Sequence, residues 1–186
     1  MDQHDYNDGT FQPFPKLSRL FREITITEKL DGTNAQIVIH DDCTTMQVGS
    51  RTKWITPKDD NFGFAKWCEA NKEDLLRLGP GQHFGEWWGA GIQRGYGLKE
   101  KRFSLFNTHR WSDPLVRPAC CGVVPVLYTG IFSERQIADA LRGLESEGSV
   151  AVPGFMKPEG VVIFHQHSGE LFKFTIGGDG HKGEAK

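Results

Sequence analysis

The sequence predicts one α+β domain, built mainly of antiparallel strands and flanked by a few helices. Short apolar stretches alternate with turn residues along most of the chain, while only two longer segments have a helical pattern. No internal repeat or linker divides the 186 residues, a length that can bury a core without disulfides or metals. We expect the folded domain to cover residues 21–176, between a loosely ordered lead-in at 1–20 and a flexible tail at 177–186.

The strands are predicted from residue type and from the turns between them. Ile24 and Ile26 alternate with threonines and lead into the turn signal Asp31-Gly32, which is typical of a strand that ends at a tight turn. A short loop at 167–169 separates the last two stretches, so these form a hairpin. The expected strands are 23–30, 35–40, 44–49, 83–88, 102–106, 123–128, 160–165 and 170–175.

Two segments have helical patterns. The first covers residues 59–78 and stops at Gly79-Pro80-Gly81, with an Asp or Asn available as N-cap. The second begins at Ser133, where Gln136 completes a capping box, and continues to Leu144. The inward-facing residues are expected to be Phe64, Trp67, Cys68, Leu75 and Leu76 in the first helix, and Ile137, Ala138, Leu141 and Leu144 in the second.

Composition narrows the class of protein. The net charge of −2 does not suggest a general nucleic-acid coat, and no apolar run approaches the ~20 residues of a membrane span. The four cysteines show no zinc spacing. We therefore expect a reduced cytoplasmic protein with no membrane contact, although Cys120-Cys121 could also be a redox pair.

One stretch combines basic and aromatic residues. It contains Arg94, Lys99, Lys101, Arg102, His109 and Arg110, with Trp87, Trp88, Tyr96 and Trp111 around them. Basic groups contact phosphates and aromatic rings stack on bases. A solvated loop beside core aromatic residues explains the same pattern, and the sequence leaves both interpretations open.

The segment most specific for chemistry is Glu28-Lys29-Leu30-Asp31-Gly32-Thr33-Asn34, which places a lysine at a strand end before a glycine turn. Such a string occurs by chance when taken alone. Five further segments follow in a fixed order: Ser50-Arg51-Thr52, Phe84-Gly85-Glu86, Phe103-Ser104-Leu105-Phe106, Glu159-Gly160-Val161-Val162 and Leu171-Phe172-Lys173-Phe174.

In these motifs the chain resembles the covalent nucleotidyltransferase superfamily, which contains ATP-dependent RNA and DNA ligases and mRNA capping enzymes. The form of the first motif, from Thr27 to Asn34, is most similar to the phage RNA ligases that seal nicks, and the resemblance covers roughly residues 20 to 176. It implies a ligase-type nucleotidyltransferase domain in which Lys29 forms a lysyl-AMP from ATP with Mg²⁺ or Mn²⁺. AMP would pass to a 5′-phosphate and be displaced by a 3′-hydroxyl, in the host cytoplasm if a phage encodes the protein.

The proposed chemistry explains why these residue types are needed. A lysine amine must be neutral to attack a phosphate, and deprotonating it at pH 7.5 costs about 4 kcal/mol. A neighbouring cation, Lys173 or a bound metal, would lower this cost. Arg51, Lys173 and Mg²⁺ are suited to stabilise the charge that develops on the α-phosphate. Lys29, Lys173 and Arg51 are accordingly the predicted catalytic residues, although Lys29 could be an exposed strand lysine and Arg51 an ordinary surface cation.

The predicted nucleotide-binding residues are Glu28, Asp31, Gly32, Asn34, Glu86, Phe106 and Glu159. Glu86 can accept hydrogen bonds from ribose hydroxyls, and Glu159 can hold the metal or a metal-bound water. Phe106 can stack on adenine, with Phe103 as its competitor. In the similar ligases, the residues that match Asn34 and Asp31 help position the nucleotide and the second substrate. Each polar residue also has a structural alternative, as a strand cap, a surface ion pair or a turn residue.

Two departures from the family pattern bear on function. The last motif usually contains a second lysine where this chain has Thr175, and Lys182 is a possible replacement. The similar nick-sealing and DNA ligases usually carry a further C-terminal domain that grips the duplex; here we expect a catalytic module alone, or one completed by a partner domain or protein. The leading prediction is an ATP-dependent RNA ligase module that acts on RNA ends rather than DNA. The alternatives are a minimal DNA ligase or adenylyltransferase, and a catalytically decayed nucleotide- or RNA-binding protein.

Overall fold

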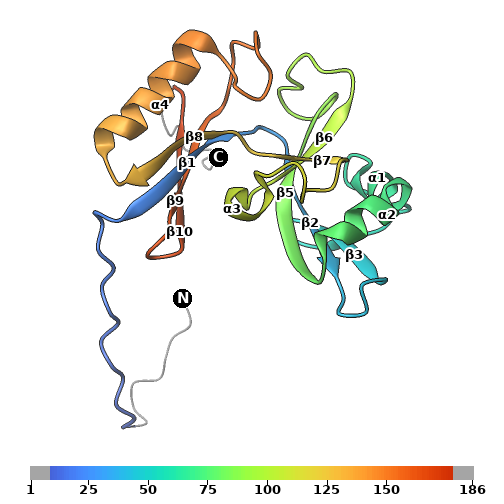
Figure 1. The fold of residues 1–186 in the computed structure, drawn as a ribbon, viewed down its shortest axis with the longest axis horizontal. Coiled ribbons are helices and arrows are strands. Elements are labelled where there is room, and N and C mark those ends of the chain that lie inside the picture. Colours follow the sequence, from blue (N-terminus) through green and yellow to red (C-terminus); the bar gives the residue numbers. More distant parts are fainter. Residues whose placement is uncertain (1–8, 178–186) are drawn as a thin grey trace, which may run out of the picture.

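The computed structural model describes residues 9–177 as two sheets with helices on their outer faces (Figure 1). The four-stranded sheet has the order β10-β9-β1-β8 and is antiparallel throughout. Its strands are β1 (Glu23–Lys29), β8 (Val126–Ile131), β9 (Gly160–His165) and β10 (Glu170–Thr175). The α+β class and the mainly antiparallel pairing predicted from the sequence are confirmed.

The six-stranded sheet has the order β4-β3-β2-β5-β6-β7, and only its β6–β7 pair is parallel. Its strands are β2 (Thr33–Ile39), β3 (Met46–Ser50), β4 (Trp54–Ile55), β5 (Gly81–Gly89), β6 (Lys101–Leu105) and β7 (Cys121–Val123). Residues 30–32 alone connect β1 to β2, so the chain passes from one sheet to the other directly after Lys29.

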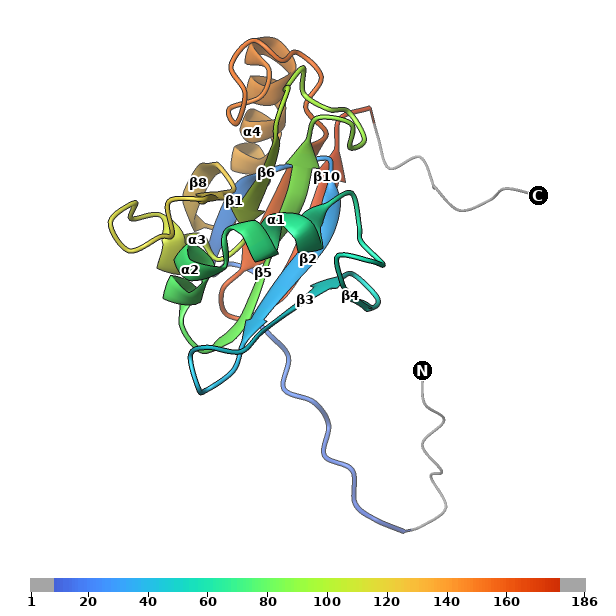
Figure 2. The same ribbon diagram turned by 90° about the vertical axis from the view of Figure 1, so that its right-hand side faces the viewer.

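The helices cover the outer face of each sheet. Helix α4 (Glu134–Glu147) packs Ile137 and Leu144 against Ile24 and Ile26 of β1. Helices α1 (Phe64–Ala70) and α2 (Lys72–Leu75), with the 3-10 turn η1 (Leu76–Leu78), cover the six-stranded sheet. Figure 2 shows α1 and α2 in front of β2 and β5. The faces turned away from these helices are the inner faces, and they lie toward each other in the middle of the molecule (Figure 1).

Side-chain alternation decides which residues reach the inner faces. In β1 the buried residues Ile24 and Ile26 point toward α4, whereas Thr25, Thr27 and Lys29 are half-buried on the inner face. In β2, Ala35 and Ile37 join the core beneath α1, which leaves Asn34 and Gln36 on the inner face. The polar motif residues therefore gather where neither sheet is covered by a helix.

The predicted helix 59–78 is wrong as a single element, because Asn71 interrupts it. Asn71 has φ −113°, and its side-chain amide donates to the Trp67 carbonyl at 2.8 Å. The N-terminal end is capped from a distance, since Asp60 accepts hydrogen bonds from the backbone N–H groups of Ala65 and Lys66. The predicted stop at Gly79 is confirmed, because this residue has φ 75° directly after η1.

The predicted strand 123–128 is also wrong as one element. Pro125 separates β7 from β8, and the two strands belong to different sheets. A proline cannot donate to a ladder, so the chain leaves one sheet before it joins the other. Strand β4 and the short helix α3 (Thr108–Trp111) were not predicted.

Residues 9–22 contain no helix or strand, and Leu20 is held by His165, whose Nε2 lies 2.9 Å from the Leu20 carbonyl oxygen. The predictions made for residues 1–8 and 178–186, including Lys182, lie outside the described residues. From residue 9 to residue 177, no helix combines the length and the apolar character that crossing a membrane requires. The four cysteines are free thiols.

Candidate active site

Lys29 is the last residue of β1, and its side chain lies against Glu159. The β1–β9 register pairs Lys29 with Gly160, so Glu159 enters directly before the partner strand. Lys29 Nζ lies 2.5 Å from Glu159 Oε2, and the two side chains are 22% and 14% exposed. The predicted nucleophile and the carboxylate predicted to hold the metal are thus brought together from positions far apart in the chain.

Glu86 approaches the same place from the six-stranded sheet. It pairs with Asn34 across β2 and β5, and its Oε1 accepts a hydrogen bond from the Gly32 backbone N–H at 3.1 Å. Burial raises the pKa of Glu86 to about 7; the positive charge of Lys29 opposes this shift and the negative charges of Glu159 and Asp31 add to it. These carboxylates therefore act on one another around a single lysine, which is typical of a functional site.

Gly32 permits this meeting of the two sheets. A Cβ at Gly32 would lie 2.4 Å from the Trp87 carbonyl oxygen and 2.6 Å from Trp88 Cβ. Only a glycine lets the turn after Lys29 approach β5 closely enough for its N–H to reach Glu86. The first motif therefore requires a glycine at position 32 for a steric reason, which the sequence did not reveal.

Lys173 and Thr175 belong to the inner face of β10. The register aligns Thr175 with Gly160 and Lys29, and aligns Lys173 with Val162 and Thr27. The residue that stands where the family usually has a second lysine is therefore in the row of Lys29 itself. Lys173 lies two residues before Thr175, and its side chain points to the same face of β10.

Arg51 follows β3 directly, one position beyond the Ala35–Ser50 pair, and its side chain is exposed. This places its backbone at the end of the sheet from which Asn34 and the turn after Lys29 emerge. Within residues 9–177, neither Arg51 nor Lys173 makes a hydrogen bond or an ion pair. Both cations can therefore accept an anionic partner.

Burial decides between the two aromatic residues, Phe106 and Phe103, that were candidates for stacking on adenine. Phe103 is fully buried and packs against Phe64, with ring centroids 5.0 Å apart, so it cannot stack on a ligand. Phe106 is 39% exposed, and its N–H donates to the carbonyl of Phe84, which is 45% exposed. Phe84 and Glu86 are two residues apart in β5, so their side chains point to the same face of the sheet. Sequence reasoning missed it, although alternation from Glu86 could have found it.

The structure does not place the Glu28 side chain with the other candidates. Glu28 is 1% exposed and has the same parity in β1 as Ile24 and Ile26, on the face opposite Lys29. Its carboxylate accepts hydrogen bonds from the Ser149 hydroxyl at 2.6 Å and from the Ala151 N–H at 2.9 Å. The predicted nucleotide contact is replaced by a structural one, because strand alternation turns neighbouring side chains to opposite faces.

The aromatic residues of the basic stretch do not form a stacking surface. Trp87, Trp88, Tyr96 and Trp111 are at most 4% exposed, and Trp87 and Trp111 belong to the core beneath α1. Arg94 and Tyr96 instead contact the turn after Lys29. Of the two interpretations left open by the sequence, core aromatic residues beside a loop is the one supported.

The carboxylates near Lys29 fit a divalent cation held by few protein ligands. Glu159 Oε2 is buried and accepts no well-oriented hydrogen bond from residues 9–177; its close neighbour is the Lys29 ammonium. No group of three or more His, Cys, Asp or Glu side chains in the described residues could form a closed cage. Mg²⁺ and Mn²⁺ suit such a site, because these ions are often bound by one or two carboxylates together with substrate phosphates.

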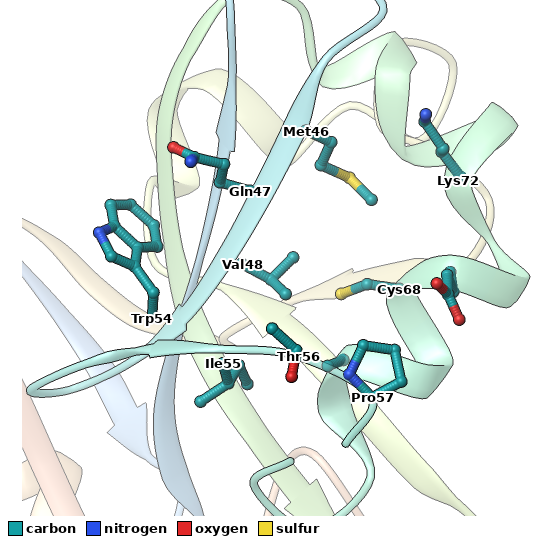
Figure 3. A pocket seen from close by; sticks show the side chains of 11 residues that line it. Met46, Gln47, Val48, Trp54, Ile55, Thr56, Pro57, Cys68 and Lys72 are labelled. Carbon is teal, nitrogen blue, oxygen red and sulfur yellow. The ribbon is translucent and has the colours of Figure 1, made fainter. Parts of the chain in front are cut away.

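A hollow of about 360 Å³ lies elsewhere, between β3, β4 and α1 (Figure 3). Its walls include Val48, Ile55 and Cys68, and it opens on the helical side of the six-stranded sheet. None of the predicted site residues lines it. The residues suited to phosphate chemistry lie on the opposite face, so we place the candidate site at Lys29.

The chain is similar to known proteins in a family pattern and in fold. A family model described as RNA ligase matches residues 22–175, while no curated protein matches the chain. Three solved structures of a Naegleria gruberi RNA ligase are similar in fold. A lysine-to-alanine variant with ATP and Mn has a TM-score of 0.61 and 22% identity, and the match covers 84% of this chain and 50% of that one.

The other two structures give similar values. A lysine-to-methionine variant with AMP and Mn has a TM-score of 0.60 and 23% identity, over 85% of this chain and 51% of that chain. An apo variant has a TM-score of 0.59 and 24% identity, over 84% and 50%. The chain thus spans about half the length of the structures it matches.

Proposed function

Because the chain belongs to the RNA ligase family, we propose that it is the nucleotidyltransferase module of an ATP-dependent RNA ligase. The observation that supports this best is the position of Lys29, at a strand end among three carboxylates that come from different parts of the chain. Two of the three Naegleria gruberi RNA ligase structures contain ATP or AMP with Mn. ATP and Mg²⁺ or Mn²⁺ are therefore the expected reactants here.

In the first step Lys29 Nζ attacks the α-phosphorus of ATP. A bond forms between Nζ and phosphorus, the bond from phosphorus to the bridging oxygen of the β-phosphate breaks, and pyrophosphate leaves. The amine loses its proton to solvent. The amine is paired with Glu159 in this structure, and this contact must open before Lys29 can attack.

The other residues act on the nucleotide. Glu86 accepts hydrogen bonds from the ribose hydroxyls, and Phe106 stacks on the base, as their places on the inner faces allow. Arg51 and Lys173 stabilise the negative charge that develops on the α-phosphate. A divalent ion held by Glu159 would supply further charge neutralisation there and favour the neutral amine.

AMP then passes to the acceptor. A 5′-phosphate oxygen attacks the phosphorus of lysyl-AMP and releases Lys29, and a 3′-hydroxyl displaces AMP to seal the strand. RNA ends, rather than DNA ends, are the proposed substrate, on the basis of the family match. The form of the first motif supports the nick-sealing type. Since the chain spans about half the length of the Naegleria gruberi structures it matches, a further domain or partner is proposed to grip the duplex.

A second candidate function rests on Thr175. A threonine in the row of Lys29 removes a cation that the family normally has, which favours a protein that binds nucleotide without transferring it. The presence together of Lys29, Arg51 and Lys173 favours the active enzyme instead.

The test is the intact mass of the denatured protein after incubation with ATP and Mg²⁺ or Mn²⁺. The starting mass is recorded first, because a purified sample can already carry AMP. A gain of one AMP in the parent but not in Lys29→Ala is expected. Lys53→Ala is a matched control, because Lys53 is an exposed lysine paired with Asp59. An adduct on Lys29→Ala would exclude Lys29 as the nucleophile, and no adduct on any protein would favour the second candidate.

A further inference from the structure

The loop between β5 and β6 holds the turn that follows Lys29 from two sides. Arg94 Nε lies 2.8 Å from Asp31 Oδ2, in a pair whose side chains are 38% and 19% exposed. Two residues further on, the Tyr96 hydroxyl oxygen accepts a hydrogen bond from the Asp31 backbone N–H at 2.9 Å. The turn is thus fixed through both its side chain and its backbone.

The same guanidinium reaches the segment that carries Glu159. Arg94 Nη1 donates to the carbonyl oxygens of Lys157 and Pro158, both at 2.8 Å. These two residues directly precede Glu159. One side chain therefore joins the residue two positions after Lys29 to the residues just before the carboxylate that Lys29 contacts.

Tyr96 strengthens this connection through packing. Its ring is 2% exposed and lies between Phe155 and Trp88, with centroid distances of 4.5 Å and 4.9 Å. Phe155 belongs to the segment that leads to Glu159, and its carbonyl accepts a hydrogen bond from the Ser149 N–H at 2.8 Å. The loop therefore holds both segments at once, by hydrogen bonds and by aromatic contact.

The backbone of this loop has energetically unfavourable φ values at two residues. Gln93 and Tyr96 have positive φ values of 45° and 54°, although neither is a glycine. Such residues persist where the surrounding contacts over-determine them, and they cluster at functional sites. Gln93 and Tyr96 lie on either side of Arg94. The strained residues are therefore at the point where the loop contacts the turn after Lys29 and the segment before Glu159.

We propose that Arg94 is a positioning residue for lysine adenylylation, which holds Asp31 and the 157–158 carbonyls so that Glu159 stays opposite Lys29. This inference rests on the proposed function. A partly exposed Arg–Asp pair contributes little to stability, so stability alone does not explain a guanidinium with three directed bonds. The planar fork of arginine suits this task, because it makes several bonds in a fixed geometry.

The test compares Arg94→Gln and Arg94→Lys with Arg142→Gln, which removes an exposed arginine paired with Asp139 on α4. Single-turnover formation of the AMP adduct is measured over a range of ATP concentrations. At saturating ATP we expect Arg94→Gln to be at least about tenfold slower than the parent, with Arg94→Lys intermediate. The ATP concentration for half-maximal rate should change less than about twofold, since the three bonds of the Arg94 guanidinium all go to the protein. Arg142→Gln should behave as the parent.

Hydrogen exchange provides a readout that does not depend on activity. If Arg94 holds the two segments, amides in 30–34 and 155–160 should exchange faster in Arg94→Gln, while the melting temperature stays near that of the parent. Unchanged exchange there, or an unchanged adenylylation rate, would overturn the proposal. So would an equal loss of rate and melting temperature in both Arg94 variants, which would indicate a structural role only. If the parent forms no adduct, the proposed function fails, and the exchange data still decide whether Arg94 holds the segments.

Discussion

Lys29 Nζ and Glu159 Oε2 lie 2.5 Å apart at the end of the β1–β9 pair, and the carboxylate oxygen has no well-oriented hydrogen bond from any other described residue. A carboxylate in this position holds the lysine side chain in an ion pair. It is also a ready ligand for a divalent ion. The same contact therefore restrains Lys29 before ATP binds. A metal ion that bound Glu159 would take the carboxylate away from Lys29 and so release the amine.

Glu159→Gln tests this dual role. The amide keeps the shape of the side chain but loses the negative charge, so we expect adduct formation to slow by about 10²-fold and to need more Mn²⁺. The measurement is the adduct rate across a Mn²⁺ titration, with the exposed Glu170→Gln on the neighbouring hairpin as control. A variant faster than the parent would mean that Glu159 only restrains Lys29.

Glu86 should make stability depend on pH. Its pKa is about 7 in the folded protein and 4.5 in the reference state, so the folded protein binds the extra proton between these values. Stability from this group is complete below pH 4.5 and is lost as pH rises to about 7. The change is on the order of 1–3 kcal/mol, given the remaining exposure of the group.

Urea unfolding of the parent and of Glu86→Gln at pH 5 and pH 8 measures this effect. The parent should lose stability relative to the variant as pH rises, because the amide cannot ionise. His83, whose pKa is lowered by burial, works in the opposite direction in both proteins and cancels in the comparison. Parallel pH profiles for the two proteins would show that Glu86 is not the responsible group.

Thr175→Lys should restore a cation in the row of Lys29. The register aligns position 175 with Gly160 and Lys29, so the new ammonium can approach the α-phosphate and stabilise the negative charge that develops there. We expect adenylylation to speed up by about tenfold. Leu171→Lys is the control, since it adds the same charge at an exposed position of the same strand face. A slower Thr175→Lys variant would show that another group already serves the phosphate.

Phe106→Ala should weaken nucleotide binding more than it slows chemistry. Loss of stacking on a base costs about 1–3 kcal/mol, so the ATP concentration for half-maximal adduct formation should rise roughly tenfold. Phe106→Trp should retain binding, and Phe84→Ala should have a smaller effect. Phe172→Ala, which removes a similarly exposed ring from β10, is the control. If Phe84→Ala has the larger effect, the base lies on β5 instead.

Glu28→Gln should destabilise the fold without abolishing the adduct. The buried carboxylate accepts hydrogen bonds from Ser149 and Ala151, and an amide would turn a donor toward one of them. The free energy of unfolding should fall by about 1–3 kcal/mol, measured by urea titration. A matched Glu23→Gln change at the exposed start of β1 should have little effect. Unchanged stability with lost ATP binding would return Glu28 to the nucleotide site.

The sequence determined much of this protein locally. Alternation of apolar residues located most strands, the glycine and proline punctuation located their ends, and the ordered motifs singled out Lys29, Glu86, Glu159 and Lys173 together. These features are readable because they depend on neighbours within a few residues. The sequence also carries the strand alternation that sends the neighbouring side chains of Glu28 and Lys29 to opposite faces of β1.

Only the tertiary structure decided which distant groups meet. The break at Pro125 sends β7 and β8 to different sheets, and the approach of Gly32 to β5 brings Glu86 to the turn after Lys29. Arg94, which sequence composition suggested for phosphate contact, instead joins Asp31 to the carbonyls before Glu159. Such contacts join residues more than fifty positions apart, and local propensity carries no information about them, because they are set by how two complete sheets pack.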